Sequence, residues 1–96
     1  MARDLQIGLE GIAQVAVSES NTAIAHGSGS VSVFATPALV GLMEKAALSS
    51  VEPLLDPGYT TVGTRVDVKH LAATPVGMNV VATSRLVEVD GKRLVF

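Results

Sequence analysis

The longest apolar stretch of the chain, Pro37 to Val51, has helical spacing, with apolar residues on nearly every side. Its few polar positions form a narrow stripe spaced at i, i+4 and i+7: Lys45, Ser49 and Glu52. Thr36 is a good N-cap, Pro37 suits the first helical position, and Pro53 ends the helix. Because so little of its surface is polar, we expect one long helix buried by a sheet wrapped around it.

Four other segments have the alternation and turn signals of β-strands. They run from about Gln6 to Val17, from Thr60 to Leu71, from Met78 to Val89 and from Lys92 to Phe96. In the second, the residues expected to point inward are Val62, Val66 and Val68. Asp90-Gly91 is a tight-hairpin signal between the last two segments. Because the returning arm has about five residues against about a dozen in its partner, we expect a chain cut short at its carboxyl end.

Ser18 to Ser30, between the first strand and the helix, is rich in Ser, Gly and Asn and is typical of a mobile loop. Within it, Thr22 to Ala25 can form a short turn of helix. The elements together predict a single α+β domain over residues 1–96, in which an antiparallel sheet surrounds one helix.

Composition narrows the classes of function. Of the 96 residues, 17% are charged and the net charge is −2, so the chain lacks the basic field of a nucleic-acid-binding protein. The absence of cysteine excludes disulfides, thiolate metal sites and cysteine nucleophiles. No stretch approaches the roughly 20 apolar residues of a membrane span, and Met1 to Asp4 does not begin a signal-peptide pattern. We therefore expect a cytoplasmic protein that binds neither nucleic acid nor membrane.

Three reactive side chains stand in apolar surroundings: Thr36, Glu44 and His70. A hydroxyl, a carboxylate and an imidazole together can hydrolyse an activated acyl group. Glu44 has only apolar helical neighbours at i±3 and i±4, so we expect it to be desolvated. Each also has an ordinary interpretation, since Thr36 suits a cap, Glu44 lies beside the polar stripe and His70 suits a strand end.

The helix start offers donors for a developing oxyanion. Pro37 lacks an N–H, but we expect the N–H groups of Ala38 and Leu39 to be unpaired, with Gly63 as a second candidate donor. Thr36 and Glu44 are 44 − 36 = 8 residues apart, or about 12 Å along a helix. They cannot touch within one helix. If both serve one site, either one comes from a second subunit or Thr36 lies at the far end of an extended substrate. Covalent attack by Thr36 and attack by water both stay open.

Three segments carry a family resemblance: VFATPALVGLMEKAA (Val33 to Ala47), TTVGTRVDVKHLAATPVG (Thr60 to Gly77) and LVEVDGKRLVF (Leu86 to Phe96). They span about two-thirds of the chain and resemble the hot-dog-fold thioesterases of the fluoroacetyl-CoA thioesterase-like family. The resemblance implies a hot-dog fold and hydrolysis of an acyl-CoA thioester without metal or redox cofactor. It also implies a homodimer or higher homo-oligomer with active sites at the subunit interface.

The same resemblance assigns residues. The threonine before the helix matches Thr36, the glutamate of GLME matches Glu44, the histidine of HLAATPVG matches His70, and a glycine near the thioester matches Gly63. One segment departs from the pattern, because His26 to Ser30 is small and polar where the fluoroacetyl-specific enzyme carries aromatic residues in a lid. This departure bears on the expectation of fluoroacetyl specificity and leaves the expectation of thioester hydrolysis unchanged; the preferred acyl group stays open.

Two alternatives remain. The chain can be a non-catalytic hot-dog subunit, which binds an acyl group or CoA or serves as a dimerisation module. It can also be a hot-dog acyl-CoA hydratase or dehydratase. Hydratases of this fold usually pair an Asp with a His. The acid nearest to His70 in sequence is Asp67, which has the opposite strand parity. That parity favours the thioesterase.

Overall fold

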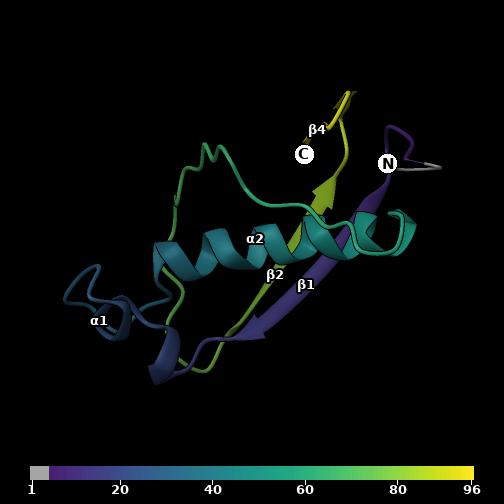
Figure 1. The fold of residues 1–96 in the computed structure, drawn as a ribbon. Helices are drawn as coiled ribbons and strands as arrows, with labels where there is room; N and C mark the ends of the chain where they lie inside the picture. Colours follow the sequence, from purple (N-terminus) through teal and green to yellow (C-terminus); the bar gives the residue numbers. More distant parts are fainter. Residues whose placement is uncertain (1–4) are drawn as a thin grey trace.

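A long helix, α2 (Thr36–Val51), lies across a two-stranded antiparallel sheet of β1 (Glu10–Ala16) and β2 (Asn79–Arg85) (Figure 1). This computed structural model describes residues 5–96. The segment Met1 to Asp4, whose pattern was weighed above for a signal peptide, lies outside the described residues. Ala13 of β1 lies opposite Ala82 of β2, and both are buried against the helix. The sheet and helix therefore form two layers with the core between them.

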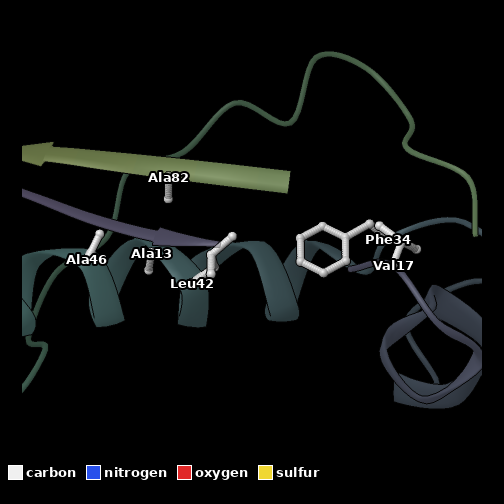
Figure 2. Packing of buried hydrophobic residues seen from close by; sticks show 6 residues of the cluster. All are labelled: Ala13, Val17, Phe34, Leu42, Ala46 and Ala82. Carbon is white, nitrogen blue, oxygen red and sulfur yellow. The ribbon is translucent and has the colours of Figure 1, made fainter. Parts of the chain in front are cut away.

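The core contains mostly small apolar side chains, with one phenylalanine, from α2, both strands and the segment that enters the helix (Figure 2). Its members are Ala13, Val17, Phe34, Leu42, Ala46 and Ala82. Alanines on both layers let the helix approach the sheet closely. At Gly11 the layers approach so closely that a Cβ would collide with the carbonyl oxygen of Ala46. Glycine at this position therefore allows β1 to cross the helix backbone.

The connection from β1 to α2 contains the 3-10 turn η1 (Glu19–Asn21) and the short helix α1 (Ala23–His26). The buried Thr22 caps α1, since its Oγ1 accepts a hydrogen bond from Ala25 N–H at 3.2 Å. Gly27, at φ 68°, ends the helix in the left-handed conformation. The predicted turn of helix in this loop is confirmed.

The predicted strand Thr60–Leu71 is wrong for the described residues, which form neither helix nor strand there. Val62 is 81% exposed and Val66 52% exposed, whereas both were expected to point inward. Val68 is half-buried. A strand needs a hydrogen-bonding neighbour, and none of the described strands lies beside this segment. Residues 60–71 therefore have the alternating sequence pattern of a strand but form no β-ladder.

The predicted strand Met78–Val89 is divided in two because the chain changes partner. The N–H of Leu86 donates to Leu9 next to β1, whereas the N–H of Val87 donates to Val95. Beyond this point β3 (Glu88–Asp90) pairs with β4 (Arg93–Val95). The predicted hairpin at Asp90-Gly91 is confirmed.

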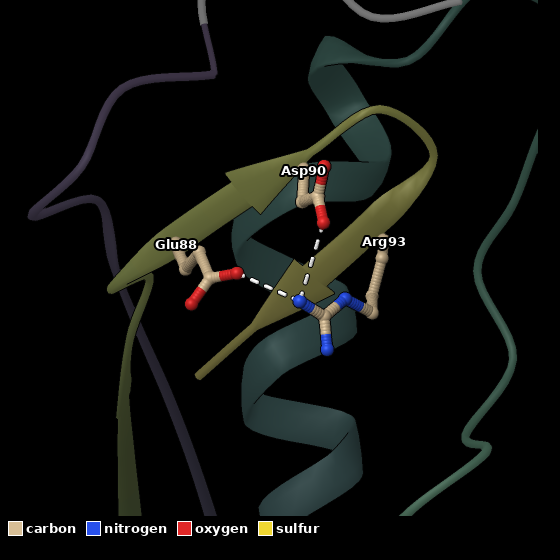
Figure 3. Close-up of polar contacts among 3 residues, drawn as sticks. All are labelled: Glu88, Asp90 and Arg93. Carbon is tan, nitrogen blue, oxygen red and sulfur yellow. Dashed lines mark hydrogen bonds and ion pairs between the residues drawn. The ribbon is translucent and has the colours of Figure 1, made fainter.

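Arg93 binds both acids of β3 across this hairpin, at 2.8 Å from Glu88 and 3.3 Å from Asp90 (Figure 3). All three side chains are more than half exposed. Exposed ion pairs contribute only about 0–1 kcal/mol each. The hairpin therefore depends mainly on its backbone pairing.

The helix α2 is buried on the side that faces the sheet, through Leu42, Ala46 and Val51. Met43 and Glu44 are exposed, so the expected desolvation of Glu44 is not observed. Two strands cover one side of a helix and leave the other side open. Within residues 5–96, no helix is long and apolar enough to cross a bilayer.

Candidate active site

The hydroxyl of Thr36 and the imidazole of His70 are hydrogen-bonded, with 2.8 Å between Oγ1 and Nδ1. Thr36 is the first residue of α2, and Ala35 occupies the N-cap position. The expectation that Thr36 caps the helix is therefore wrong by one residue, a common offset at helix ends. Since its hydroxyl caps nothing, it is available to the imidazole.

Residues 59–74 bring His70 to the helix start by returning along α2 from its carboxyl end to its amino end, in an arch (Figure 1). The arch is fastened at its far end, where Phe34 N–H donates to Thr74 O at 2.8 Å and Val33 bridges to Pro75. His70 is half-buried four residues before this fastening. The pair therefore joins two segments 34 residues apart in sequence.

The pair has two chemical forms, set by the imidazole tautomer. With the proton on Nε2, Nδ1 accepts the Thr36 hydroxyl proton and can activate that oxygen as a nucleophile. With the proton on Nδ1, the ring donates to Thr36 and its Nε2 lone pair can deprotonate water. Either form supplies a general base at the helix start.

A hollow of about 250 Å³ lies beside this pair. It is lined by Ala23, Ser28, Val33, Phe34, Thr36, His70, Leu71, Ala72 and Ala73. No lysine or arginine occurs among these described lining residues. The Thr36 hydroxyl and the His70 imidazole therefore face a shallow, open hollow that offers no cationic side chain to a substrate.

Glu44 and Gly63 meet at the middle of α2. The Glu44 carboxylate lies against the Gly63 backbone so closely that a Cβ on residue 63 would overlap Oε2. Gly63 is thus a point of close approach between residues 59–74 and α2. This contact lies eight residues along the helix from Thr36, or about 12 Å. The structure thus brings Thr36 to His70 and, separately, Glu44 to Gly63.

Of the two N–H groups at the start of α2 that were expected to be unpaired, one is hydrogen-bonded. The N–H of Leu39 donates to Ala35 O at 2.9 Å, which removes it from the candidate oxyanion donors. The N–H of Ala38 lies in the first turn, where a helix beginning at Thr36 provides no carbonyl for it. Ala38, together with the positive end of the helix dipole, remains the candidate donor.

Sequence reasoning missed the small lining residues of the hollow: Ala23, Ser28, Ala72 and Ala73. Alanine has no reactive group, so residue type alone does not mark it as part of a site. The available signal was position, since Ala72-Ala73 lies between His70 and Thr74-Pro75. Within residues 5–96, no three His, Asp or Glu side chains gather as a metal site would require.

Comparisons with known proteins agree on one family. The model of the fluoroacetyl-CoA-specific thioesterase family, FlK, matches residues 17–96. The fluoroacetyl-CoA thioesterase of Streptantibioticus cattleyicolor is 48% identical over 62 residues, which cover 65% of this chain and 45% of that protein. The chain belongs to the FlK family.

Solved structures of FlK show the same fold. One matches 96% of this chain and 73% of its own, at 34% identity and a TM-score of 0.88. A phenylalanine-to-alanine variant of FlK in complex with fluoroacetate and CoA matches at 35% identity and a TM-score of 0.84, covering 94% of this chain and 77% of its own. The predictions of a hot-dog fold and of a thioesterase family are confirmed.

Proposed function

We propose that this protein hydrolyses acyl-CoA thioesters, with Thr36 and His70 as its reactive pair. The observation that carries the proposal is their 2.8 Å hydrogen bond beside an open hollow. A threonine hydroxyl is a weak nucleophile unless a base lies within hydrogen-bond reach, and His70 is that base. The FlK family membership supports the reaction class, since its named members act on an acyl-CoA.

The reaction follows from the positions of these groups. His70 takes a proton from the Thr36 hydroxyl, or from a water beside it, as the oxygen attacks the thioester carbonyl carbon. The carbonyl oxygen becomes an oxyanion beside the N–H of Ala38 and the positive end of α2. The C–S bond then breaks, and the imidazolium returns its proton to the thiolate of CoA. In the covalent route, water later releases the acyl group from Thr36.

We further propose that Glu44 reaches this site from a second copy of the chain. Within one chain it lies about 12 Å along the helix from Thr36, but its side chain is exposed, with the carboxylate against the Gly63 backbone. A two-fold dimer would place each Glu44 in the partner's site and create two equivalent sites. There the carboxylate can orient the imidazole or activate water. Gly63 gives the carboxylate room.

Release of free thiol from acetyl-CoA and hexanoyl-CoA tests the reaction, with Thr36→Val and Thr36→Ser compared. Valine keeps the shape without the hydroxyl, so we expect a loss of about 10²-fold or more in kcat. Serine keeps the hydroxyl and should stay within about tenfold of the unmodified protein. Circular dichroism controls for folding. Equal activity in both variants would show that the hydroxyl takes no part.

A further inference from the structure

Three short segments pair with one another close to the reactive pair, and we call them the clamp. They are residues 21–23, residues 33–35 and residues 74–75. Antiparallel bridges join the first segment to the second and the second to the third. Thr36 follows the middle segment directly, and His70 lies four residues before the third. The clamp therefore holds the chain on both sides of the Thr36–His70 hydrogen bond.

Two backbone hydrogen bonds of the clamp set where α2 begins and where the arch ends. Ala35, at the N-cap of α2, donates its N–H to Asn21 O at 3.0 Å. Phe34 donates its N–H to Thr74 O at 2.8 Å. The Phe34 side chain is 2% exposed and belongs to the core, so the middle segment is itself held in place. A shift of residue 21 would therefore move the start of α2 relative to the arch.

The side chain of Asn21 ties the clamp to the sheet. Its Oδ1 accepts a hydrogen bond from Ser18 N–H at 2.9 Å, and its Nδ2 donates to Ala16 O at 3.0 Å. Ala16 is the last residue of β1 and lies opposite Asn79 of β2. The amide supplies an acceptor and a donor at a fixed separation, which neither a hydroxyl nor a carboxylate does. Both ends of this half-buried side chain are thus used.

We propose that Asn21 is a positioning residue for the reaction, which acts through Ala35 to hold the Thr36 hydroxyl at hydrogen-bonding distance from His70. Asn21 does not line the hollow, so it acts through the backbone and not by contact with substrate. Its effect on rate follows because a displacement of about 1 Å in a reactive group can cost about 10²-fold. This inference rests on the proposed function for that effect on rate, whereas the hydrogen bond can be observed without any reaction.

Asn21→Ala and Asn21→Asp test this role in two measurements. Alanine removes both side-chain hydrogen bonds, and aspartate keeps the acceptor but places a second oxygen against Ala16 O. We expect kcat for acetyl-CoA to fall by about tenfold or more in both variants, with KM within about threefold. Nitrogen-15 NMR of the imidazole observes the hydrogen bond directly. The His70 Nδ1 signal should move from its position in the unmodified protein towards its position in Thr36→Val, which lacks the hydroxyl.

Two control variants separate positioning from a general loss of stability. Asn79→Ala removes an exposed amide opposite Ala16, outside the clamp, and should change neither kcat nor the His70 signal. Val51→Ala truncates a fully buried side chain at the other end of α2. It should lower the urea midpoint at least as much as Asn21→Ala does, again without changing kcat or the His70 signal.

An unmoved His70 signal in a folded Asn21→Ala or Asn21→Asp variant overturns the inference. So does a signal that moves equally in Val51→Ala, because lower stability alone would then explain it. Full kcat in the Asn21 variants, where Thr36→Val is inactive, overturns the role in the reaction and leaves the proposed function standing. If the unmodified protein cleaves no thioester, the proposed function fails, and the His70 signal alone decides whether Asn21 holds the pair together.

Discussion

At the scale of single residues, the position of the cap decides what Thr36 can do. A threonine at the N-cap, one residue earlier, would accept a hydrogen bond from a backbone N–H of the first turn. Here Ala35 holds that position, and the Thr36 hydroxyl bonds His70. The sequence identified both residues but not this bond. Their 34-residue separation is closed only by the return of residues 59–74 along α2.

Glu44→Gln tests the carboxylate. The amide keeps the shape but cannot act as a base, so we expect kcat to fall by about 10²-fold or more. Because Glu44 is exposed, the free energy of unfolding should change by less than about 0.5 kcal/mol. Glu19→Gln, at an exposed position of η1, is the control and should keep full activity. Thiol release and urea denaturation measure the two effects, and an unchanged kcat in Glu44→Gln would make Glu44 a solvent-facing residue.

Gly63→Ala tests the contact between the arch and α2. The new methyl group would overlap the Glu44 carboxylate, the flexible end of a side chain that can move aside. We therefore expect kcat to fall by about tenfold or more while the unfolding midpoint changes little. Gly58→Ala is an unsuitable control because Gly58 has a positive φ of 85°. Val62→Ala, at the exposed neighbouring position, serves instead. Full activity in Gly63→Ala would mean that the position of the Glu44 carboxylate does not matter for the reaction.

At the scale of elements, the sequence predicted correctly those helices and turns that depend on residues close in the chain. Helix α2, the turn at Thr22 to Ala25 and the Asp90-Gly91 hairpin all depend on residues close in sequence. The segment Thr60–Leu71 has an equally regular pattern and forms no strand. Its ladder depends on a neighbour that alternation cannot supply. For the same reason, the sequence pattern did not predict that the hydrogen-bonding partner changes between Leu86 and Val87.

Gly41→Ala tests how open α2 is. Gly41 lies in the middle of this helix, and a Cβ there would meet nothing within 4 Å. Alanine should therefore raise the free energy of unfolding by about 0.5–1 kcal/mol. Chemical denaturation at low protein concentration measures the change. Destabilisation would mean that another copy packs on the helix at this point.

At the scale of the whole molecule, the chain is more extended than its length requires. Its radius of gyration is 14.8 Å, whereas a compact domain of 100 residues has about 13 Å. Val62 and Leu71 are each more than 80% exposed, and α2 is open on one side. Apolar surface on this scale favours association. We therefore expect at least a dimer in solution.

Mixing inactive chains tests whether that dimer shares its sites. Chains carrying Thr36→Val and chains carrying Glu44→Gln are co-expressed with different tags, and heterodimers are purified through both tags. If each site uses Thr36 of one chain and Glu44 of its partner, one site of the heterodimer has both substitutions and the other has neither. Activity should then return to about half that of the unmodified dimer. Verified heterodimers without activity would place both residues in the site of one chain.

The backbone of residues 59–74 decides which unfolding measurement reports on the reactive pair. Residues 61–73 make no backbone hydrogen bond with another described residue, whereas α2 has its helical hydrogen bonds and β1 pairs with β2 along its whole length. Their amide hydrogens should exchange with deuterium almost as fast as in an open chain, and protection should be confined to α2, β1 and β2. His70 thus belongs to a segment without backbone hydrogen bonds, and Thr36 to the start of a hydrogen-bonded helix. A melting curve followed by helical ellipticity therefore reports the scaffold, and the reactive pair can separate well before that curve begins to change.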